Sequence, residues 1–292
     1  MTAFRLAFVM AATLAGSALP AHSDQKEATR LWETAGFKNP ESVLFDAGAS
    51  MLYVSNVNGE PTAKDGNGFI SKVSPDGKVQ AMEWVTGLDA PKGMAMAGGK
   101  LYAADIDKLA EIDIATGKVV KTYDAKDAKF LNDVTADSAG NIYVSDMATD
   151  TIWRLASGTF EIFLQDKALE GPNGLLAEGD DLIVGSWGII TEGFSTKTPG
   201  HLKKVSLKDK SIASLGDGTP IGNLDGVEPL GDGAYLVTDW VAGKVFRIGR
   251  KGKVRTLAEL GPGTADLGWD AKTSTAFIPQ MQTGVLYGYK IE

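Results

Sequence analysis

The residues best suited to chemistry in this sequence are four oxygen-bearing side chains that lie far apart along the chain. They are Glu41, Asn132, Asn173 and Asp225, and each opens a short segment that recurs through the sequence. If the four come together they suit a hard divalent cation. Ca²⁺ takes about 6–8 oxygen ligands from carboxylates, amide carbonyls and water, and it tolerates irregular geometry. The alternative is that each Asn or Asp only caps a turn through backbone contacts.

The recurring segment that could bring these residues together is a β-strand unit. Runs such as Met51-Leu52-Tyr53-Val54-Ser55 alternate between two faces, and pairs such as Asp76-Gly77 punctuate them as turns. The unit starts at residues 41, 92, 132, 173, 225 and 266, so successive starts are 51, 40, 41, 52 and 41 residues apart. A four-stranded propeller blade takes about 40–50 residues. The sequence therefore predicts an all-β fold, a six-bladed β-propeller, as a single domain over residues 24–292.

The last of these six units is one strand short. It ends at Glu292 after its third strand, whereas residues 28–37 precede the first unit with nothing to pair with. We predict that residues 28–37 form the outer strand of the last blade and close the ring, which removes two exposed sheet edges. A frayed tail is the alternative. In a closed propeller the opening residues of the first strands face one mouth of the central channel, so the four oxygen-bearing residues are expected to converge there.

The first 23 residues have the character of an export signal. Arg5 precedes an apolar run over residues 6–19, and Ala21-His22-Ser23 offers small residues for cleavage after Ser23. The run of about fourteen residues is shorter than the roughly 20 that span a bilayer. The sequence thus predicts a periplasmic or secreted protein with no membrane span after cleavage. Its net charge of −8, without a Lys/Arg cluster, argues against nucleic acid and anionic membranes as partners.

Several segments around the four residues resemble the signatures of the SMP-30/gluconolactonase/LRE-like family, in that family's order and over essentially all of residues 28–292. They are Pro40-Glu41-Ser42-Val43-Leu44-Phe45-Asp46, Leu131-Asn132-Asp133-Val134, Gly140-Asn141-Ile142-Tyr143-Val144-Ser145-Asp146, Pro172-Asn173-Gly174-Leu175 and Asp225-Gly226-Val227. The resemblance implies a six-bladed propeller that holds one divalent cation, usually Ca²⁺, at the channel mouth.

The resemblance also implies a role for each of the four residues. Glu41, Asn173 and Asp225 would hold the cation, and Asn132 would lie beside it and face the substrate. The sequence departs from the family pattern near two of them. Lys129-Phe130-Leu131 stands where members that act on sugar lactones tend to have an arginine, and Leu224 replaces a proline often found before Asp-Gly.

Two classes of function follow from this set of residues. The first is an exported metal-dependent hydrolase that opens a lactone or a related ester. There the cation would stabilise the oxyanion formed when a metal-associated water attacks, Asp225 would help to deprotonate that water, and Asn132 would orient the substrate. The second is a non-catalytic, metal-stabilised propeller that binds a small ligand or a protein at the channel mouth. A strictosidine-synthase-like condensing enzyme is a more distant alternative.

Other conspicuous residues are expected to serve the fold. The absence of cysteine excludes a thiol nucleophile, a zinc–thiolate site and an iron–sulfur cluster. Of the two histidines, His22 lies in the export signal and His201 aligns with third strands away from the channel, which disfavours a histidine-dependent lactonase or lyase. Trp187 is expected to be a buried aromatic, with a place in a pocket wall as the alternative. A regular series at the ends of second strands is expected to cap turns: Asn56, Asp105, Asp146 and Asp239.

Overall fold

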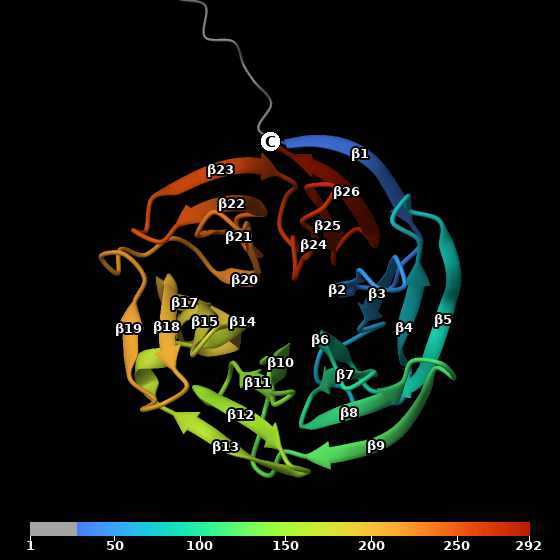
Figure 1. Cartoon of the computed structure of the whole chain (residues 1–292), viewed down its shortest axis with the longest axis horizontal. Coiled ribbons are helices and arrows are strands. Elements are labelled where there is room, and N and C mark those ends of the chain that lie inside the picture. The colour runs from blue at the N-terminus through green and yellow to red at the C-terminus, as the bar shows by residue number, and fades with distance from the viewer. Residues whose placement is uncertain (1–27) are drawn as a thin grey trace, which may run out of the picture.

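The computed structural model describes residues 28–292, which form a ring of six antiparallel four-stranded sheets around a central channel (Figure 1). The six-bladed β-propeller predicted from the repeat is thereby confirmed. The predicted export signal and its cleavage after Ser23 lie outside the described residues. Within residues 28–292, no helix is long and apolar enough to cross a membrane.

The strands fill the blades in chain order, except that the first described strand belongs to the last blade. Blade 1 consists of β2 (Pro40–Asp46), β3 (Met51–Asn56), β4 (Gly68–Val73) and β5 (Val79–Leu88), and blade 2 of β6 (Pro91–Ala97), β7 (Lys100–Asp105), β8 (Lys108–Asp113) and β9 (Lys118–Asp124). Blade 3 consists of β10 (Leu131–Ala136), β11 (Ile142–Asp146), β12 (Thr151–Ala156) and β13 (Thr159–Gln165), and blade 4 of β14 (Pro172–Glu178), β15 (Asp181–Ser186), β18 (Leu202–Ser206) and β19 (Ile212–Ser214). Blade 5 consists of β20 (Leu224–Pro229), β21 (Ala234–Asp239), β22 (Lys244–Gly249) and β23 (Val254–Glu259), and blade 6 of β24 (Gly268–Asp270), β25 (Thr275–Gln280), β26 (Val285–Ile291) and β1 (Ala28–Ala35).

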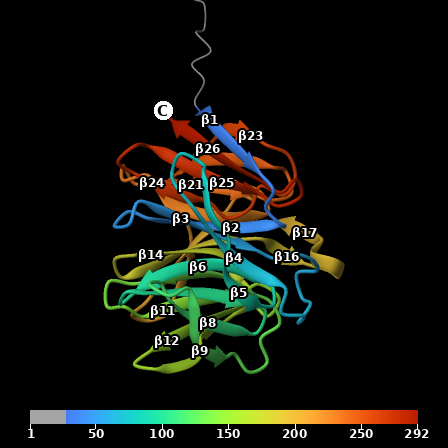
Figure 2. The same cartoon turned by 90° about the vertical axis from the view of Figure 1, so that its right-hand side faces the viewer.

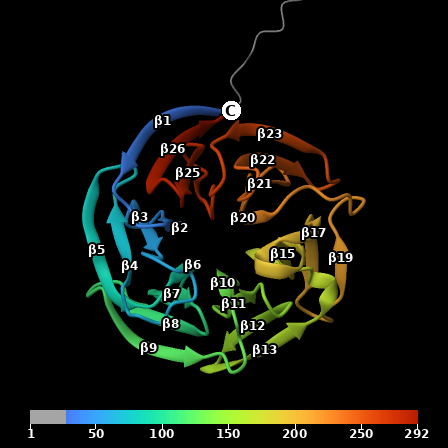
Figure 3. The ribbon, with the colours of Figure 1, turned by 180° about the vertical axis from the view of Figure 1, so that it is seen from behind.

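Strand β1 closes the ring, as predicted for residues 28–37. It pairs antiparallel with β26, from Ala28 opposite Ile291 to Ala35 opposite Val285. Seen from behind, β1 runs along the outer rim beside β26, so the first described strand and the last strand share one blade (Figure 3). This pairing covers the edge that β26 would otherwise expose.

The hydrophobic core is divided among the six interfaces between neighbouring blades. Between blades 1 and 2, for example, Tyr53 and Ile70 pack with Leu101 and Ile112 in one buried cluster. Each of the other five interfaces has a cluster of the same kind. Because the apolar side chains are buried between the blades, the channel does not have to supply a hydrophobic core and can hold polar side chains.

A β-bulge at the opening of the first strand directs side chains into the channel. In blade 1, Pro40 pairs with Asn56 but Val43 pairs with Val54, so Glu41 and Ser42 share the space of one partner residue. Blades 2 to 5 shift register at the same place. In blade 1 the bulged N–H of Ser42 donates to Ser55 Oγ over 2.9 Å. Bulges of this kind re-aim side chains at barrel rims and next to functional sites.

The sixth unit begins one residue earlier than the sequence alignment placed it. Thr264 bridges Gln280 as Pro40 pairs with Asn56, so Ala265, not Asp266, occupies the opening position. Asp266 lies one residue deeper in the channel, where its Oδ2 accepts a hydrogen bond of 2.5 Å from Ser42 Oγ. The segment that begins at Asp266 is similar in composition to the one at Asp225, but the position where pairing begins determines which residue faces the mouth.

Two connections between second and third strands are longer than the others. They are residues 57–67 in blade 1 and residues 187–201 in blade 4. The second contains the turn η2 (Glu192–Phe194) within a hairpin of β16 (Gly188–Ile190) and β17 (Thr196–Pro199). In the side view this hairpin lies at one face of the ring (Figure 2). The insertions account for the two long steps of 51 and 52 residues in the repeat.

Candidate active site at the channel mouth

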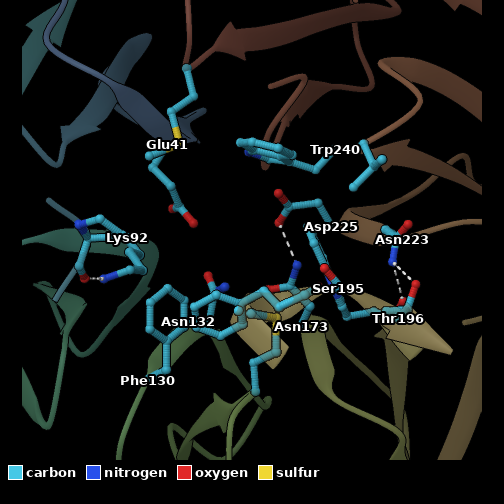
Figure 4. Close-up of a pocket in the computed structure, with 17 residues that line it drawn as sticks. Glu41, Lys92, Phe130, Asn132, Asn173, Ser195, Thr196, Asn223, Asp225 and Trp240 are labelled. Atoms are coloured by element: carbon cyan, nitrogen blue, oxygen red, sulfur yellow. Dashed lines mark hydrogen bonds between the residues drawn. The ribbon is translucent and has the colours of Figure 1, made fainter. Parts of the chain in front are cut away.

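One mouth of the channel opens into a cavity of about 570 Å³. Opening residues of five blades line it, and they include all four predicted site residues: Glu41, Lys92, Asn132, Asn173 and Asp225 (Figure 4). The side chains of the four predicted residues are nearly inaccessible to solvent. A concave site of this volume is in the range that binds small molecules, about 300–1,000 Å³. The structure therefore brings together residues that span most of the chain.

Asn173 and Asp225 are joined directly across blades 4 and 5. Asn173 Nδ2 donates to Asp225 Oδ1 over 3.1 Å and to the Leu224 carbonyl over 3.1 Å. The close approach depends on Gly174, where a Cβ would lie 1.8 Å from the Asp225 carbonyl oxygen. Since real side chains essentially never come this close, the Asn-Gly pair reflects packing as well as chemistry.

Two acceptor atoms of the site are buried without a hydrogen-bond partner. They are Glu41 Oε2 and Asn173 Oδ1. An unsatisfied buried polar atom costs about 1–3 kcal/mol, and more when it is charged. Two such acceptors at the wall of one cavity are the signature expected of a site built for a positively charged group.

The charges of the site point the same way. Burial, and then the nearby Asp225, raises the pKa of Glu41 well above its ordinary value. Burial, and then Asp266, likewise raises the pKa of Asp225. Both shifts arise mainly because burial disfavours the ionised form of a carboxyl, and a second carboxylate near each group adds to the effect. A bound cation would stabilise the ionised forms of both carboxyls.

The donor set fits a hard cation rather than a soft one. Among the described residues, no group of three or more His, Cys, Asp or Glu side chains is arranged to hold a metal ion. The oxygen atoms at the mouth come instead from the carboxylates of Glu41 and Asp225 and the amides of Asn132 and Asn173. Carboxylate and amide oxygens together with water match the preferences of Ca²⁺.

Lys92 is a site residue that the sequence analysis missed. Its Nζ donates to the Ala90 carbonyl over 2.8 Å and to the Pro61 carbonyl over 3.1 Å, and it lies 4.7 Å from the centroid of the Phe130 ring. Burial lowers the pKa of Lys92 to about 8. Its position in the repeat could have identified it, because Lys92 opens the second unit as Glu41 opens the first. It was not predicted because it carries an ammonium group and no side-chain oxygen.

An aromatic wall forms another part of the cavity, and it was not predicted as a set. Phe130, Met147 and Trp187 make one buried cluster against which Phe194 and Trp240 pack. Trp187 is only 8% exposed, yet it also lines the cavity, so it is both a buried aromatic and a wall residue. The inserted residues contribute as well, with Pro61 from blade 1 and Phe194 from blade 4.

The residues at the ends of the second strands serve the fold, although not all of them cap the turn that follows. Asp105 and Asp146 accept backbone N–H groups of the loops that precede the first strands of their blades, at distances between 2.7 and 3.1 Å. Asp239 caps the turn that follows it, and Asn56 Oδ1 accepts the Lys38 N–H. His201 Nε2 is bonded to Ser214 Oγ over 2.9 Å and does not line the cavity.

Comparison with known proteins identifies the fold and nothing more specific. No family model matches the sequence, and a search of curated proteins found no match. Among solved structures, a gluconolactonase of Xanthomonas campestris superposes with a TM-score of 0.67 at 13% identity, over 91% of this chain and 89% of that one. A putative gluconolactonase gives 0.64 at 17% identity, over 91% and 92%. A virginiamycin B lyase of Staphylococcus aureus, with quinupristin, gives 0.60 at 13% identity, over 91% and 100%.

These comparisons confirm the predicted resemblance in fold to gluconolactonases. The same fold occurs in a lyase and in a chain of a nidogen/laminin complex, which superposes with a TM-score of 0.58 at 17% identity over 76% of this chain and 80% of that one. Since one fold serves different activities, the function of this chain has to be argued from its site.

Proposed function

We propose that the protein is a hydrolase that opens a lactone or a related ester at this channel mouth, with a divalent cation held by Glu41, Asn173 and Asp225. Ca²⁺ is the ion that the donor set favours. The observation that carries the proposal is the pair of buried acceptors without partners, Glu41 Oε2 and Asn173 Oδ1, beside Asp225 in one cavity. The export signal predicted from the sequence makes the periplasm or the medium the proposed place of action.

The residues that line the cavity have distinct roles in this proposal. When bound, the cation supplies a Lewis acid for the carbonyl oxygen of the substrate. Asn173 occupies Asp225 Oδ1, which leaves Oδ2 to accept a proton from the attacking water. Asn132 lies at the cavity wall with 5% of its surface exposed, where its amide can orient the substrate. The aromatic wall excludes bulk water from the reacting groups.

The test measures turnover of a panel of lactones and esters through the protons that hydrolysis releases. Wild type is compared with Glu41→Gln and Asp225→Asn, which keep side-chain size and remove the charge. Glu83→Gln, on the exposed side of β5, is the matched control. We expect turnover by the wild type and the control, and a loss of about 100-fold or more in the two site variants. Equal turnover in all four proteins would contradict the proposal.

A non-catalytic binding module is the second candidate, and one observation favours it. Among the residues that line the cavity, only Glu41, Lys92 and Asp225 titrate. Lys92 Nζ already donates to two backbone carbonyls, so no carboxylate or histidine of the cavity lining stands apart from the proposed cation ligands as a general base. A propeller that binds a small ligand or a protein needs no such base. Cation binding that depends on Asp225, with no turnover of any lactone or ester in the panel, would decide for this candidate.

A further inference from the structure

The walls of the cavity away from the cation ligands are largely apolar. Phe130, Met147, Trp187, Phe194 and Trp240 all line it. Figure 4 shows Phe130 and Trp240 on either side of the group that contains Glu41, Asn132, Asn173 and Asp225. The four predicted site residues thus form one group, and aromatic surface flanks them.

Several donor groups within this aromatic part already have partners in the protein, whereas Ser195 Oγ and Asn223 Oδ1 have none among residues 28–292. Trp187 Nε1 donates to the Phe194 carbonyl over 2.8 Å. Asn223 Nδ2 donates to the Trp187 carbonyl over 2.8 Å and to Thr196 Oγ1 over 3.2 Å. Two protons of Lys92 Nζ go to backbone carbonyls. A ligand with hydroxyl groups over its whole surface would therefore find partners at these few polar atoms and none along the aromatic side chains.

The apolar surface also continues outward to the rim of the cavity. Val241 lines the cavity and is 47% exposed, and Phe194, on the inserted hairpin, also lines it and is half-buried. Exposed large apolar side chains beside a pocket mark a binding surface when they continue its lining. The rim can therefore accommodate an apolar group that is too long for the cavity alone.

From this arrangement we infer that the substrate is a lactone or ester with an apolar alkyl or aryl body, rather than a polyhydroxylated sugar lactone. The inference rests on the proposed function and specifies its substrate class. The ester group would lie at the acidic group of residues, and the body would lie against Trp240 and the rim at Val241. Each hydroxyl buried here without a partner weakens binding about tenfold, whereas each apolar group buried strengthens it.

The test compares two probes that share a six-membered lactone ring: δ-decalactone, with an alkyl chain, and glucono-1,5-lactone, with hydroxyl groups. Binding to the full chain with Ca²⁺ is followed by tryptophan fluorescence, and turnover by proton release. We expect δ-decalactone to bind at least tenfold more tightly. Tighter or equal binding of glucono-1,5-lactone would overturn the inference.

Variants locate the binding site of the apolar body. Trp240→Ala is expected to weaken δ-decalactone binding about tenfold and Val241→Ser several-fold. Val254→Ser, which changes a valine 38% exposed on β23, is the control and should have no effect. Unchanged δ-decalactone binding in both Trp240→Ala and Val241→Ser would also overturn the inference. Val241→Ser keeps this test valid if Trp240→Ala does not fold.

The two proposals fail in different ways. Preference for glucono-1,5-lactone, with turnover that depends on Asp225, would overturn the inferred substrate class and leave the hydrolase standing. Tight δ-decalactone binding that needs Trp240, with no turnover of any lactone, would support the apolar site and contradict the hydrolase.

Discussion

Asn173 donates a hydrogen bond of 3.1 Å to Asp225 across the interface of two blades, although 52 residues separate them in the sequence. This bond determines which end of the amide is available at the cavity. Because Nδ2 is committed to Asp225 Oδ1 and the Leu224 carbonyl, Oδ1 is left as a buried acceptor. The same contact therefore ties two blades together and leaves an acceptor atom for a cation.

Replacing this donor with a second carboxylate should make folding depend on a cation. Asn173→Asp removes the bond to Asp225 and adds a like charge beside it. In chelator we expect Tm to fall by about 5 °C or more, and Ca²⁺ should raise the Tm of the variant more than that of wild type. Differential scanning fluorimetry measures both. The control is Asn141→Asp, because Asn141 also donates to an aspartate, Asp137, over 2.7 Å, but far from the cavity. A Ca²⁺ response no larger than that of wild type would refute the role assigned to Asn173.

A buried serine links the bulge of blade 3 to the site. Ser145 Oγ accepts the Asp133 N–H over 2.9 Å and donates to the Asn173 carbonyl over 2.7 Å. We expect Ser145→Ala to lower the free energy of unfolding by about 1–3 kcal/mol and to weaken cation binding. The control is Ser186→Ala, because Ser186 is as buried and donates to the Leu169 carbonyl over 2.7 Å. Ser186→Ala should lower the free energy of unfolding and leave cation affinity unchanged. Equal effects of the two variants on cation affinity would show that Ser145 does not position Asn173.

The close approach at Gly174 should tolerate no side chain. A Cβ at this position would meet the Asp225 carbonyl oxygen at 1.8 Å, so Gly174→Ala must push blades 4 and 5 apart. We expect a loss of at least about 3 kcal/mol, or failure to fold, in chemical denaturation. At Gly249 the nearest atom to an added Cβ is the Lys253 carbonyl oxygen at 3.9 Å, so Gly249→Ala is a mild control. Wild-type stability of Gly174→Ala would disprove this packing.

Stability should also depend on a carboxyl at the opposite mouth of the channel. Glu228 lines the cavity there with Asp266, and burial, followed by the nearby Asp266, raises its pKa to about 8. The folded state therefore binds this proton more tightly than the unfolded chain does, for which the value is 4.5. The free energy of unfolding should consequently fall as pH rises from about 4.5 to about 8.

Glu228→Gln should remove this part of the pH dependence. In thermal unfolding the variant is expected to match wild type near pH 4.5 and to be more stable at pH 9, since it no longer buries a charge there. Glu83→Gln, on the outer strand β5, should follow wild type at both pH values. A Glu228→Gln protein less stable than wild type at pH 9 would contradict the cause assigned to the shift.

The parts of the molecule that the sequence could predict are those that repeat. Strand alternation and turn pairs recur in every blade, so the fold, the closing strand over residues 28–37 and the convergence of Glu41 with Asp225 were accessible. The opening position of Ala265 could not be predicted, because a bulge shifts register without changing the apolar pattern. Asp266 was therefore aligned in its place.

The aromatic wall was less accessible for a different reason. Phe194 and Trp240 lie in connections whose course follows no period, and their positions depend on contacts with Trp187. The two long steps in the repeat indicated insertions, but not that both would reach the same mouth. Lys92 opens the second unit and could have been recognised from the repeat, but only side chains with oxygen donors were considered as site residues.

The most direct test of the central claim, a cation site at this channel mouth, is a calorimetric titration of the protein with Ca²⁺. Wild type and Glu83→Gln are predicted to bind one ion, and Glu41→Gln and Asp225→Asn to bind it about 100-fold more weakly or not at all, because each loses a charged ligand. Absence of binding to wild type by Ca²⁺, Mg²⁺, Mn²⁺ and Zn²⁺, or unchanged affinity in both site variants, would contradict the account.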